Sequence, residues 1–304
     1  MEICLAGTGG MLPLKERWLT CCYIEHNGSS LLIDCGEGTQ IALAEYGCKL
    51  SRIETLLITH CHADHISGLP GLLLSMGNSS RTRPLDIFIP QGGRKIVEKL
   101  CCICCALPYG ITVHELSVQD ISRFDVPSLD SLASITSLPL KHSVPCLGYS
   151  LEIGKKPVFL PERAEKLGIP VKLWSSLHKG ESVTLDTGRT VLPQEVLGES
   201  RKGIKITYVT DTLPFDGIAE LAEGSDLFIC EGMYGETDKK ESMDCKGHML
   251  MQDACRLAEK AVAERLWLTH YSPAEKRPER FENELKEIFP AATVSRDGQK
   301  ISLK

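Results

Sequence analysis

The sequence contains no long hydrophobic run and no large excess of one charge. No apolar stretch approaches the length that a helix needs to span a bilayer, so we expect no membrane segment and no membrane partner. The formal net charge of −6 gives no general indication of nucleic-acid binding. The chain opens with Met1-Glu2 and shows neither the basic nor the apolar region of a signal peptide. These absences favour a cytoplasmic protein.

The composition also argues against disorder and against a disulfide framework. Hydrophobic residues make up 42% and charged residues 24% of the 304 positions, which is ordinary for one large α/β domain or two smaller ones. The 14 cysteines are better explained as reduced, small apolar residues than as disulfides, because the chain is long and leaderless. The segment Cys101-Cys102-Ile103-Cys104-Cys105 resembles a metal-binding knuckle, but it falls in a predicted helix (93–106) and lacks a suitable second ligand pair. Packing is the favoured explanation, and its role stays open.

A dense cluster of metal-binding side chains follows the apolar run 55–58. His60, His62, Asp64 and His65 occupy four of six consecutive positions. In a turning backbone, His60 and His62 can face one ion, while Asp64 and His65 face a second ion beside it. Imidazole with one carboxylate favours zinc or a similar metal over magnesium or calcium. The alternative is a polar turn with scattered histidines, which packing explains poorly.

Further polar residues directly follow apolar strands downstream, namely His142, Asp211, Glu231 and His270. Strand ends in α/β folds collect at one edge of a sheet, so we expect these side chains to meet the first cluster, with Glu231 outside the ligand set. Periodicity predicts three strands within 2–35 with a hairpin turn at Asn27-Gly28, further strands at 85–89, 111–115, 134–140, 205–209, 227–230 and 266–268, and further helices at 39–46, 66–76, 249–263 and 278–289. This pattern fits helices on both outer faces of a β-sandwich.

The regular pattern loosens between residues 155 and 200, where only short helical pieces are expected. We interpret 155–200 as an arm that projects from a single domain spanning 1–304. From Lys155 to Gly180 there are six lysines and arginines against two glutamates, an excess of four positive charges. The excess indicates either a nucleic-acid contact or a solvated helix face, and charge alone does not separate these.

Together these motifs resemble a known family. His60-x-His62-x-Asp64-His65, with His142, Asp211 and His270 downstream, resembles the metallo-β-lactamase fold, an αββα sandwich with a dinuclear zinc site. The match extends to 34–40 (Asp-Cys-Gly-Glu-Gly-Thr-Gln), Gly68-Leu69-Pro70-Gly71, Gly148-Tyr149, Asp211-Thr212 and Lys246-Gly247-His248. These segments are similar to ribonuclease Z, the short-form endonucleases that mature tRNA 3′ ends.

The resemblance implies a role for each of these residues. One zinc ion would be held by His60, His62 and His142, the other by Asp64, His65 and His270, with Asp211 bridging both. Asp64 would be the general base. His248 would protonate the departing oxygen, which we take to be the 5′ oxygen. The resemblance also implies a homodimer with two Zn²⁺ ions per subunit, whose arm binds precursor tRNA at its elbow. The expected activity is therefore a zinc-dependent endoribonuclease that removes the 3′ trailer and leaves a 3′-hydroxyl.

Three departures from the family pattern keep other readings open. Pro170 is followed by Val171-Lys172-Leu173-Trp174 in place of Gly-Pro, although Lys172 and Trp174 could supply phosphate and stacking contacts. The chain has Lys15-Glu16-Arg17-Trp18 where family members often show Arg-Asn after the lysine, which puts the handling of the discriminator end and of CCA ends in doubt. Met249 replaces a hydroxyl residue. The alternatives are a phosphodiesterase acting on small or non-tRNA substrates and a tRNA-binding protein with a vestigial site. A di-iron redox protein is disfavoured because such proteins usually carry glutamate in place of His62.

Overall fold

The computed structural model describes residues 1–304 except 105, 200 and 240–244. The chain divides into two compact units, one formed by residues 1–152 and 204–304 and the other by residues 153–203. No helix among the described residues is both long enough and apolar enough to span a membrane. Every cysteine that the structure describes is a free thiol.

The first large sheet has the strand order β16-β1-β2-β3-β4-β5-β6. Its strands are β1 (Glu2–Gly7), β2 (Cys21–His26), β3 (Ser29–Ile33), β4 (Ile53–Leu57), β5 (Leu85–Pro90), β6 (Ile111–Leu116) and β16 (Gln299–Ser302). The sheet is antiparallel from β16 to β3 and parallel from β3 to β6. The predicted hairpin turn is confirmed, because Asn27 and Gly28 join β2 to β3 with φ values of 50° and 84°.

The second large sheet has the order β15-β14-β13-β12-β9-β8-β7. Its strands are β7 (Ser122–Asp125), β8 (Ala133–Pro139), β9 (Leu147–Lys155), β12 (Arg201–Val209), β13 (Leu227–Glu231), β14 (Leu266–Thr269) and β15 (Ala292–Val294). The four strands from β12 to β15 run parallel to one another, so their carboxyl ends lie at one edge of the sheet.

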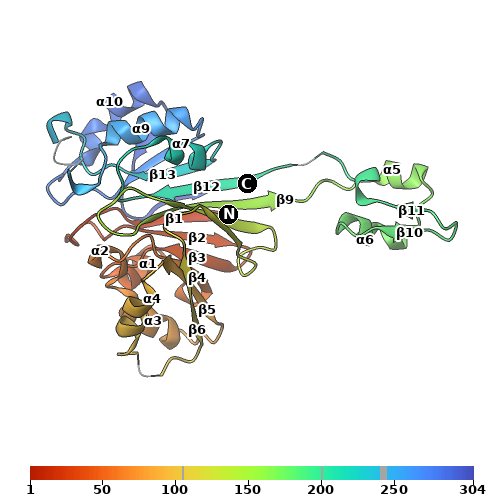
Figure 1. Ribbon diagram of the computed structural model, residues 1–304, viewed down its shortest axis with the longest axis horizontal. Coiled ribbons are helices and arrows are strands. Elements are labelled where there is room, and N and C mark those ends of the chain that lie inside the picture. Colours follow the sequence, from red (N-terminus) through yellow and green to blue (C-terminus); the bar gives the residue numbers. More distant parts are fainter. Residues whose placement is uncertain (105, 200, 240–244) are drawn as a thin grey trace. The chain divides into compact units, whose positions relative to one another are not determined.

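Helices cover the outer face of each sheet, and the predicted αββα sandwich is confirmed (Figure 1). The first sheet carries α1 (Thr39–Glu45), α3 (Leu69–Asn78) and α4 (Arg94–Cys101), and the second carries α7 (Asp216–Ala222), α9 (Met251–Lys260) and α10 (Glu282–Ile288). Successive side chains of the central strands point to opposite faces of their sheet, and both faces are buried. In the first sheet, for example, Leu32 and Leu56 pack with the helices, while the equally buried Leu31 and Leu57 point the other way, towards the second sheet.

The single helix predicted over 66–76 is instead two helices, α2 (Ala63–Ile66) and α3. Pro70 lies in the first turn of α3, where its missing N–H costs no helical hydrogen bond, and it prevents α2 from continuing into α3. Gly68 lies so close to Gly36 that an added Cβ would sit 2.0 Å from the Gly36 carbonyl oxygen. The break therefore brings the backbone of this segment against the loop that follows β3.

The cysteine-rich helix is shorter than predicted. Helix α4 ends at Cys101, and Cys105 lies outside the described residues. Cys101 and Cys104 pack against the core of the first sheet and its helices, while Cys102 is exposed. Among the described residues, the side chains close enough to share a metal ion include no cysteine.

Residues 153–203 have a small core of their own. This unit contains α5 (Pro161–Lys166), α6 (Trp174–His178) and a two-stranded sheet of β10 (Val183–Thr184) and β11 (Thr190–Val191). Its core includes Ala164, Leu177 and Val191. The indole N–H of Trp174 donates to the Ile169 carbonyl at 2.9 Å, and its ring packs beside Phe159. Trp174 is thus used for packing within this unit rather than presented as a free stacking surface.

Candidate metal centre

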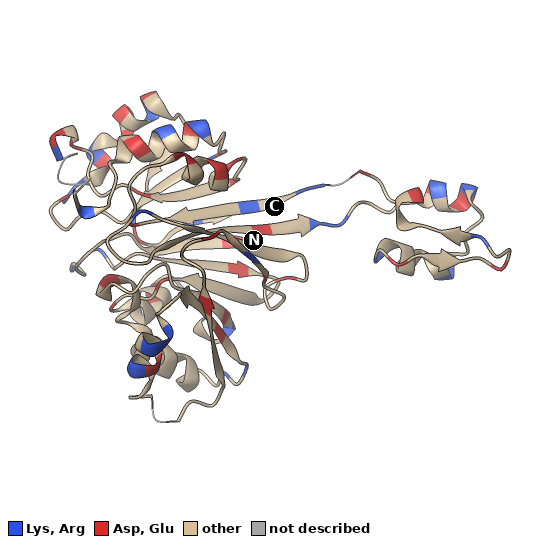
Figure 2. Cartoon of the chain, viewed as in Figure 1, with Lys and Arg blue, Asp and Glu red and all other residues tan. Residues whose placement is uncertain are grey.

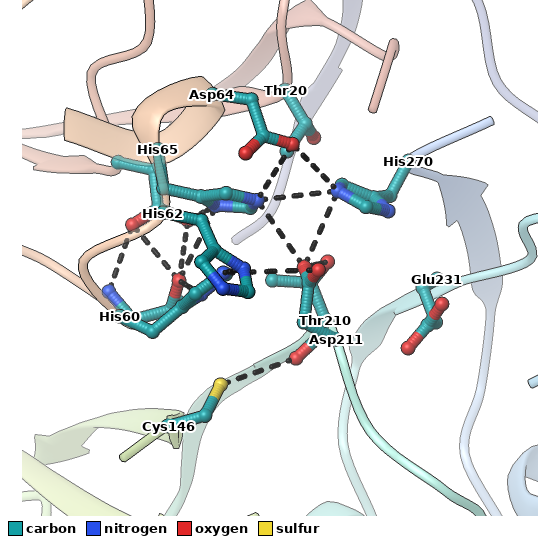
Figure 3. Close-up of polar contacts among 12 residues, drawn as sticks. Thr20, His60, His62, Asp64, His65, Cys146, Thr210, Asp211, Glu231 and His270 are labelled. Carbon is teal, nitrogen blue, oxygen red and sulfur yellow. Dashed lines mark hydrogen bonds and ion pairs between the residues drawn. The ribbon is translucent and has the colours of Figure 1, made fainter. Parts of the chain in front are cut away.

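The ends of parallel strands from both sheets deliver the polar residues of one site (Figure 3). Asp34 directly follows β3, Asp211 lies two residues past β12, and His270 directly follows β14. These three residues have φ values of 61°, 58° and 59°, a left-handed conformation that non-glycine residues rarely adopt. The chain turns sharply at each strand end, which aims the side chain into the site, and backbone strain of this kind is typical of functional sites.

The structure brings all seven predicted ligands together. One group whose ligand atoms lie within 4.8 Å of one another consists of His60, His62, His142 and Asp211, and a second consists of Asp64, His65 and His270. His60 and His62 come from the loop after β4, and Asp64 and His65 from α2. His142 lies in the loop between β8 and β9.

The spacing of the imidazole nitrogens fits a tetrahedral metal ion. Two nitrogens bound at 2.0–2.1 Å to such an ion are about 3.3 Å apart. Nε2 of His65 lies 3.2 Å from Nε2 of His270, and Nδ1 of His62 lies 3.2 Å from Nε2 of His142. The second nitrogens of two rings are already occupied, since Nδ1 of His142 donates to the Gly247 carbonyl at 3.0 Å and Nδ1 of His65 donates to Asp34 at 2.8 Å.

Protonation agrees with this arrangement. Burial lowers the pKa of His60 and of His142, which keeps both rings in the neutral form that binds metal. Burial would also lower the pKa of His65, but Asp211 and Asp34 outweigh it and raise that pKa well above its usual value. The carboxylates that attract a proton to His65 would equally attract a metal cation.

Asp211 lies between the two groups. Its Oδ1 is 3.8 Å from Nε2 of His60 and 3.9 Å from Nε2 of His142. Its Oδ2 is 3.2 Å from Nε2 of His65 and 3.3 Å from Nε2 of His270. Each carboxylate oxygen therefore faces one of the two groups.

Asp64 and His248 lie at the open side of the centre. Burial would raise the pKa of Asp64, but hydrogen bonds with His270 and His65 outweigh it and lower that pKa, so the side chain is ionised. Nδ1 of His248 donates to Glu231 at 3.0 Å. Burial opposes protonation of His248, but Glu231 outweighs it and raises the pKa of His248 to about 9.

His248 is also close to two of the ligands, Asp211 and His270. However, the atom of His248 that lies 3.8 Å from Asp211 is Nδ1, which is already bonded to Glu231. This geometry favours a proton-transfer role over a ligand role for His248. Glu231 accepts that hydrogen bond and another from the Thr212 N–H at 2.6 Å, so it supports the site from outside the ligand set.

A cavity of about 360 Å³ opens onto this centre. It is lined by Met11, His62, Ala63, Asp64, His142, Ser143, Asp211, Met233, Lys246, His248 and His270. A larger cavity of about 490 Å³ elsewhere includes none of the predicted ligands. The smaller cavity is therefore the candidate active site, because acid–base groups and metal ligands converge there.

Two supporting residues were missed from the sequence. Asp34 is buried and accepts hydrogen bonds from His65, from the Thr59 N–H at 2.8 Å and from the Thr59 hydroxyl. The sequence did contain a signal for Asp34, because this residue also directly follows an apolar strand. The Met11 N–H donates to Oδ2 of Asp64 at 2.7 Å, a main-chain contact that residue type does not reveal.

Comparison with known proteins identifies the family. A family model described as Anti-Pycsar protein Apyc1 matches residues 1–101. Over 304 residues, the chain is 45% identical to Ribonuclease Z of Lachnoclostridium phytofermentans, which covers 100% of this chain and 98% of that relative. The chain belongs to the ribonuclease Z family. This finding confirms the resemblance stated from the sequence motifs.

Solved structures agree on the fold of this ribonuclease Z. Human tRNase Z, short form, superposes with a TM-score of 0.71 at 24% identity and 100% coverage of both chains. The metallo-beta-lactamase fold protein YhfI from Bacillus subtilis gives a TM-score of 0.67 at 18% identity, covering 99% of this chain and 98% of that one. As a ribonuclease Z, the chain is a hydrolytic endoribonuclease with the metallo-β-lactamase fold, and its clusters of histidine and aspartate are suited to bind metal.

Proposed function

We propose that this ribonuclease Z removes the 3′ trailer from tRNA precursors in the cytoplasm, leaving a 3′-hydroxyl on the tRNA. The observation that carries the proposal is the convergence of seven predicted metal ligands, five of which line one cavity together with His248, in a chain 45% identical to a ribonuclease Z over its length. Full-length similarity of this kind favours tRNA processing over phosphodiester hydrolysis of small or non-tRNA substrates.

We assign two zinc ions to each subunit. His60, His62 and His142 would hold one ion, Asp64, His65 and His270 the other, and Asp211 would bridge them through its two oxygens. Imidazole and carboxylate donors at these spacings suit zinc. When bound, a zinc pair supplies Lewis acidity that lowers the pKa of a water molecule and neutralises charge on the phosphate.

The protein's own groups then move the protons. Asp64 orients the attacking water and accepts its proton. Because the tRNA keeps a 3′-hydroxyl, the bond that breaks joins phosphorus to O3′ of the tRNA, and the new P–O bond leaves a 5′-phosphate on the trailer. The departing oxygen is therefore O3′, and our expectation of a 5′ oxygen was wrong. His248, protonated through Glu231, donates the proton to O3′.

Recognition of tRNA is assigned to residues 153–203, which together hold nine lysines and arginines and six acidic residues. Figure 2 shows both signs of charge on its helix α5. Lys172 is exposed and can contact phosphate. We further propose a homodimer, as the family resemblance implies, and exposed Ile41 on α1 and Leu74 on the adjacent α3 are available to such an interface.

The test is a cleavage assay on a precursor tRNA that carries a 3′ trailer, with and without a zinc chelator. We expect chelator-sensitive cleavage at the mature 3′ end, and RNA sequencing of the products should show a 3′-hydroxyl on the tRNA. Cleavage elsewhere, or cleavage that resists chelation after metal content has fallen to zero, would contradict the proposal. Analytical ultracentrifugation tests the homodimer separately.

A further inference from the structure

The loop between β1 and β2 is fastened to the chain segment that carries His270. Gly9 forms a β-bridge with Tyr271, and the Gly10 N–H donates to the Tyr271 carbonyl at 2.9 Å. Farther along the loop, the Arg17 guanidinium donates to the Glu275 carbonyl at 2.8 Å. The loop is therefore held in register with the strand end that delivers His270 to the site.

Met11 has an unusual backbone for its side chain. Its φ of 64° lies in the left-handed region, which residues other than glycine rarely adopt. Met11 itself is 52% exposed. In this conformation the Met11 N–H points at Oδ2 of Asp64, at 2.7 Å. That oxygen also lies 3.5 Å from both His65 and His270, so the amide touches the carboxylate at the oxygen that faces the second ligand group.

Gly10 lies against the His270 ring, as the Met11 amide lies against Asp64. An added Cβ on Gly10 would lie 2.6 Å from Cε1 and 2.8 Å from Nε2 of the His270 ring. Nδ1 of His270 is buried and has no hydrogen-bond partner among the described residues, whereas His65 and His142 are each oriented by a hydrogen bond through Nδ1. Contact with the Gly10 backbone thus takes the place of that hydrogen bond.

We propose that Gly10 and Met11 are positioning residues for one of the two metal ions, the ion assigned to Asp64, His65 and His270. Gly10 fixes the His270 ring by contact, and the Met11 amide fixes Asp64 by its hydrogen bond. In the other group, His60 contacts Thr59 and His142 contacts Gly247, and neither of these supports belongs to the loop that carries Gly10 and Met11. The inference rests on the metal assignment proposed above, but not on the identity of the RNA substrate.

Because Gly10 and Met11 support only one of the two ligand groups, the proposal predicts that the two ions are lost separately. Partners that orient metal ligands typically change metal affinity or activity by about 10–100-fold when they are removed. Removing the Met11 N–H should therefore lower the affinity for one zinc ion by at least about tenfold and leave the affinity for the other unchanged. Under chelator, the zinc content should fall in two separated steps instead of together.

The sharpest test replaces only the Met11 N–H with an ester oxygen. A synthetic 1–20 thioester that carries the ester can be ligated to recombinant 21–304 at Cys21, and an all-amide ligation product provides the reference. The matched control is an ester at Leu14, whose N–H donates to the Arg17 carbonyl within the same loop. Zinc content is measured by elemental analysis across a chelator titration. Selective loss of one ion from the Met11 ester alone supports the proposal.

An equal effect of both esters, or none, would overturn it, as would a reference protein that binds fewer than two ions. A genetic version compares Gly10→Ala with Gly110→Ala, because an added Cβ at Gly110 meets nothing within 4 Å. Gly10→Ala should lose one ion selectively, and if it loses both ions or neither, the role of Gly10 is wrong. These readouts do not depend on RNA cleavage, so the proposal can fail while the nuclease assignment stands, and the reverse.

Discussion

The most informative single substitution is Asp34→Asn, which changes one buried carboxylate to an amide of the same shape. The Thr59 N–H donates to Oδ1 of Asp34, whereas Oδ2 faces His65, so the amide oxygen of an asparagine would take the place of Oδ1. Its NH₂ group would then face Nδ1 of His65, which donates to the carboxylate at 2.8 Å in the native protein. Two donors cannot bond to each other. In the neutral ring, the form that binds metal, the proton on His65 must therefore move from Nδ1 to Nε2, the nitrogen that faces His270 and Asp211.

A proton on Nε2 competes directly with a metal ion. We expect a loss of about 10–100-fold in affinity for the ion next to His65, which corresponds to roughly 1.4–2.8 kcal/mol. Hydrogen bonds to charged groups contribute about 1.5–3 kcal/mol, so the two estimates agree. Nuclease activity at limiting zinc should fall by a similar factor and recover in part at high zinc.

A matched control exists on the surface. Asp86 accepts from Nε2 of His114 at the same distance, 2.8 Å, but both side chains are about 40% exposed and neither belongs to a metal group among the described residues. Asp86→Asn should leave zinc affinity unchanged. Competition with a zinc-binding dye measures affinity in both variants, and circular dichroism checks folding. Retention of both ions in folded Asp34→Asn with native affinity would refute this reasoning.

Four further predictions concern the acid, the ligands and the inserted unit. His248→Ala should keep both zinc ions but slow cleavage by about 10²–10⁴-fold, and a zinc-free variant in elemental analysis would exclude the acid role. Glu231→Gln should shift the alkaline limb of the pH–rate profile to lower pH, because Glu231 raises the pKa of His248 and the acid must be protonated below that pKa; an unmoved limb contradicts this. His62→Ala should lose zinc and activity together, in contrast to His248→Ala. Deleting 157–180 should abolish precursor tRNA cleavage but retain hydrolysis of bis-p-nitrophenyl phosphate, and equal loss of both would point to misfolding or to a direct role in chemistry.

The ligands of the candidate site could be predicted because they are metal-binding residue types that either follow an apolar strand or cluster with His60. His60, for example, is a metal-binding residue type and also follows an apolar strand, and the structure does bring it to Asp211. The Met11 contact could not be predicted, since a backbone N–H is common to almost all residues and only the φ of 64° aims it at Asp64. Which ions occupy the site is not encoded in any single residue.

Prediction of the fold succeeded where the hydrophobic pattern was long and regular. The parallel strands β13 and β14 are buried along their whole length and appear as nearly continuous apolar runs. Strand β7 has only four residues, with no fully buried position, so its pattern is too short to detect. The break between α2 and α3 was missed because glycine and proline are also compatible with the first turn of a helix.

The inserted residues 153–203 leave the sandwich through β9 and return through β12, and these two strands are neighbours in the second sheet. Because β9 and β12 are adjacent, the segment that connects them is under little geometric constraint. The length and charge of residues 153–203 can therefore change during evolution, or be altered by an engineer, while Asp211, which follows the other end of β12, keeps its place among the predicted metal ligands.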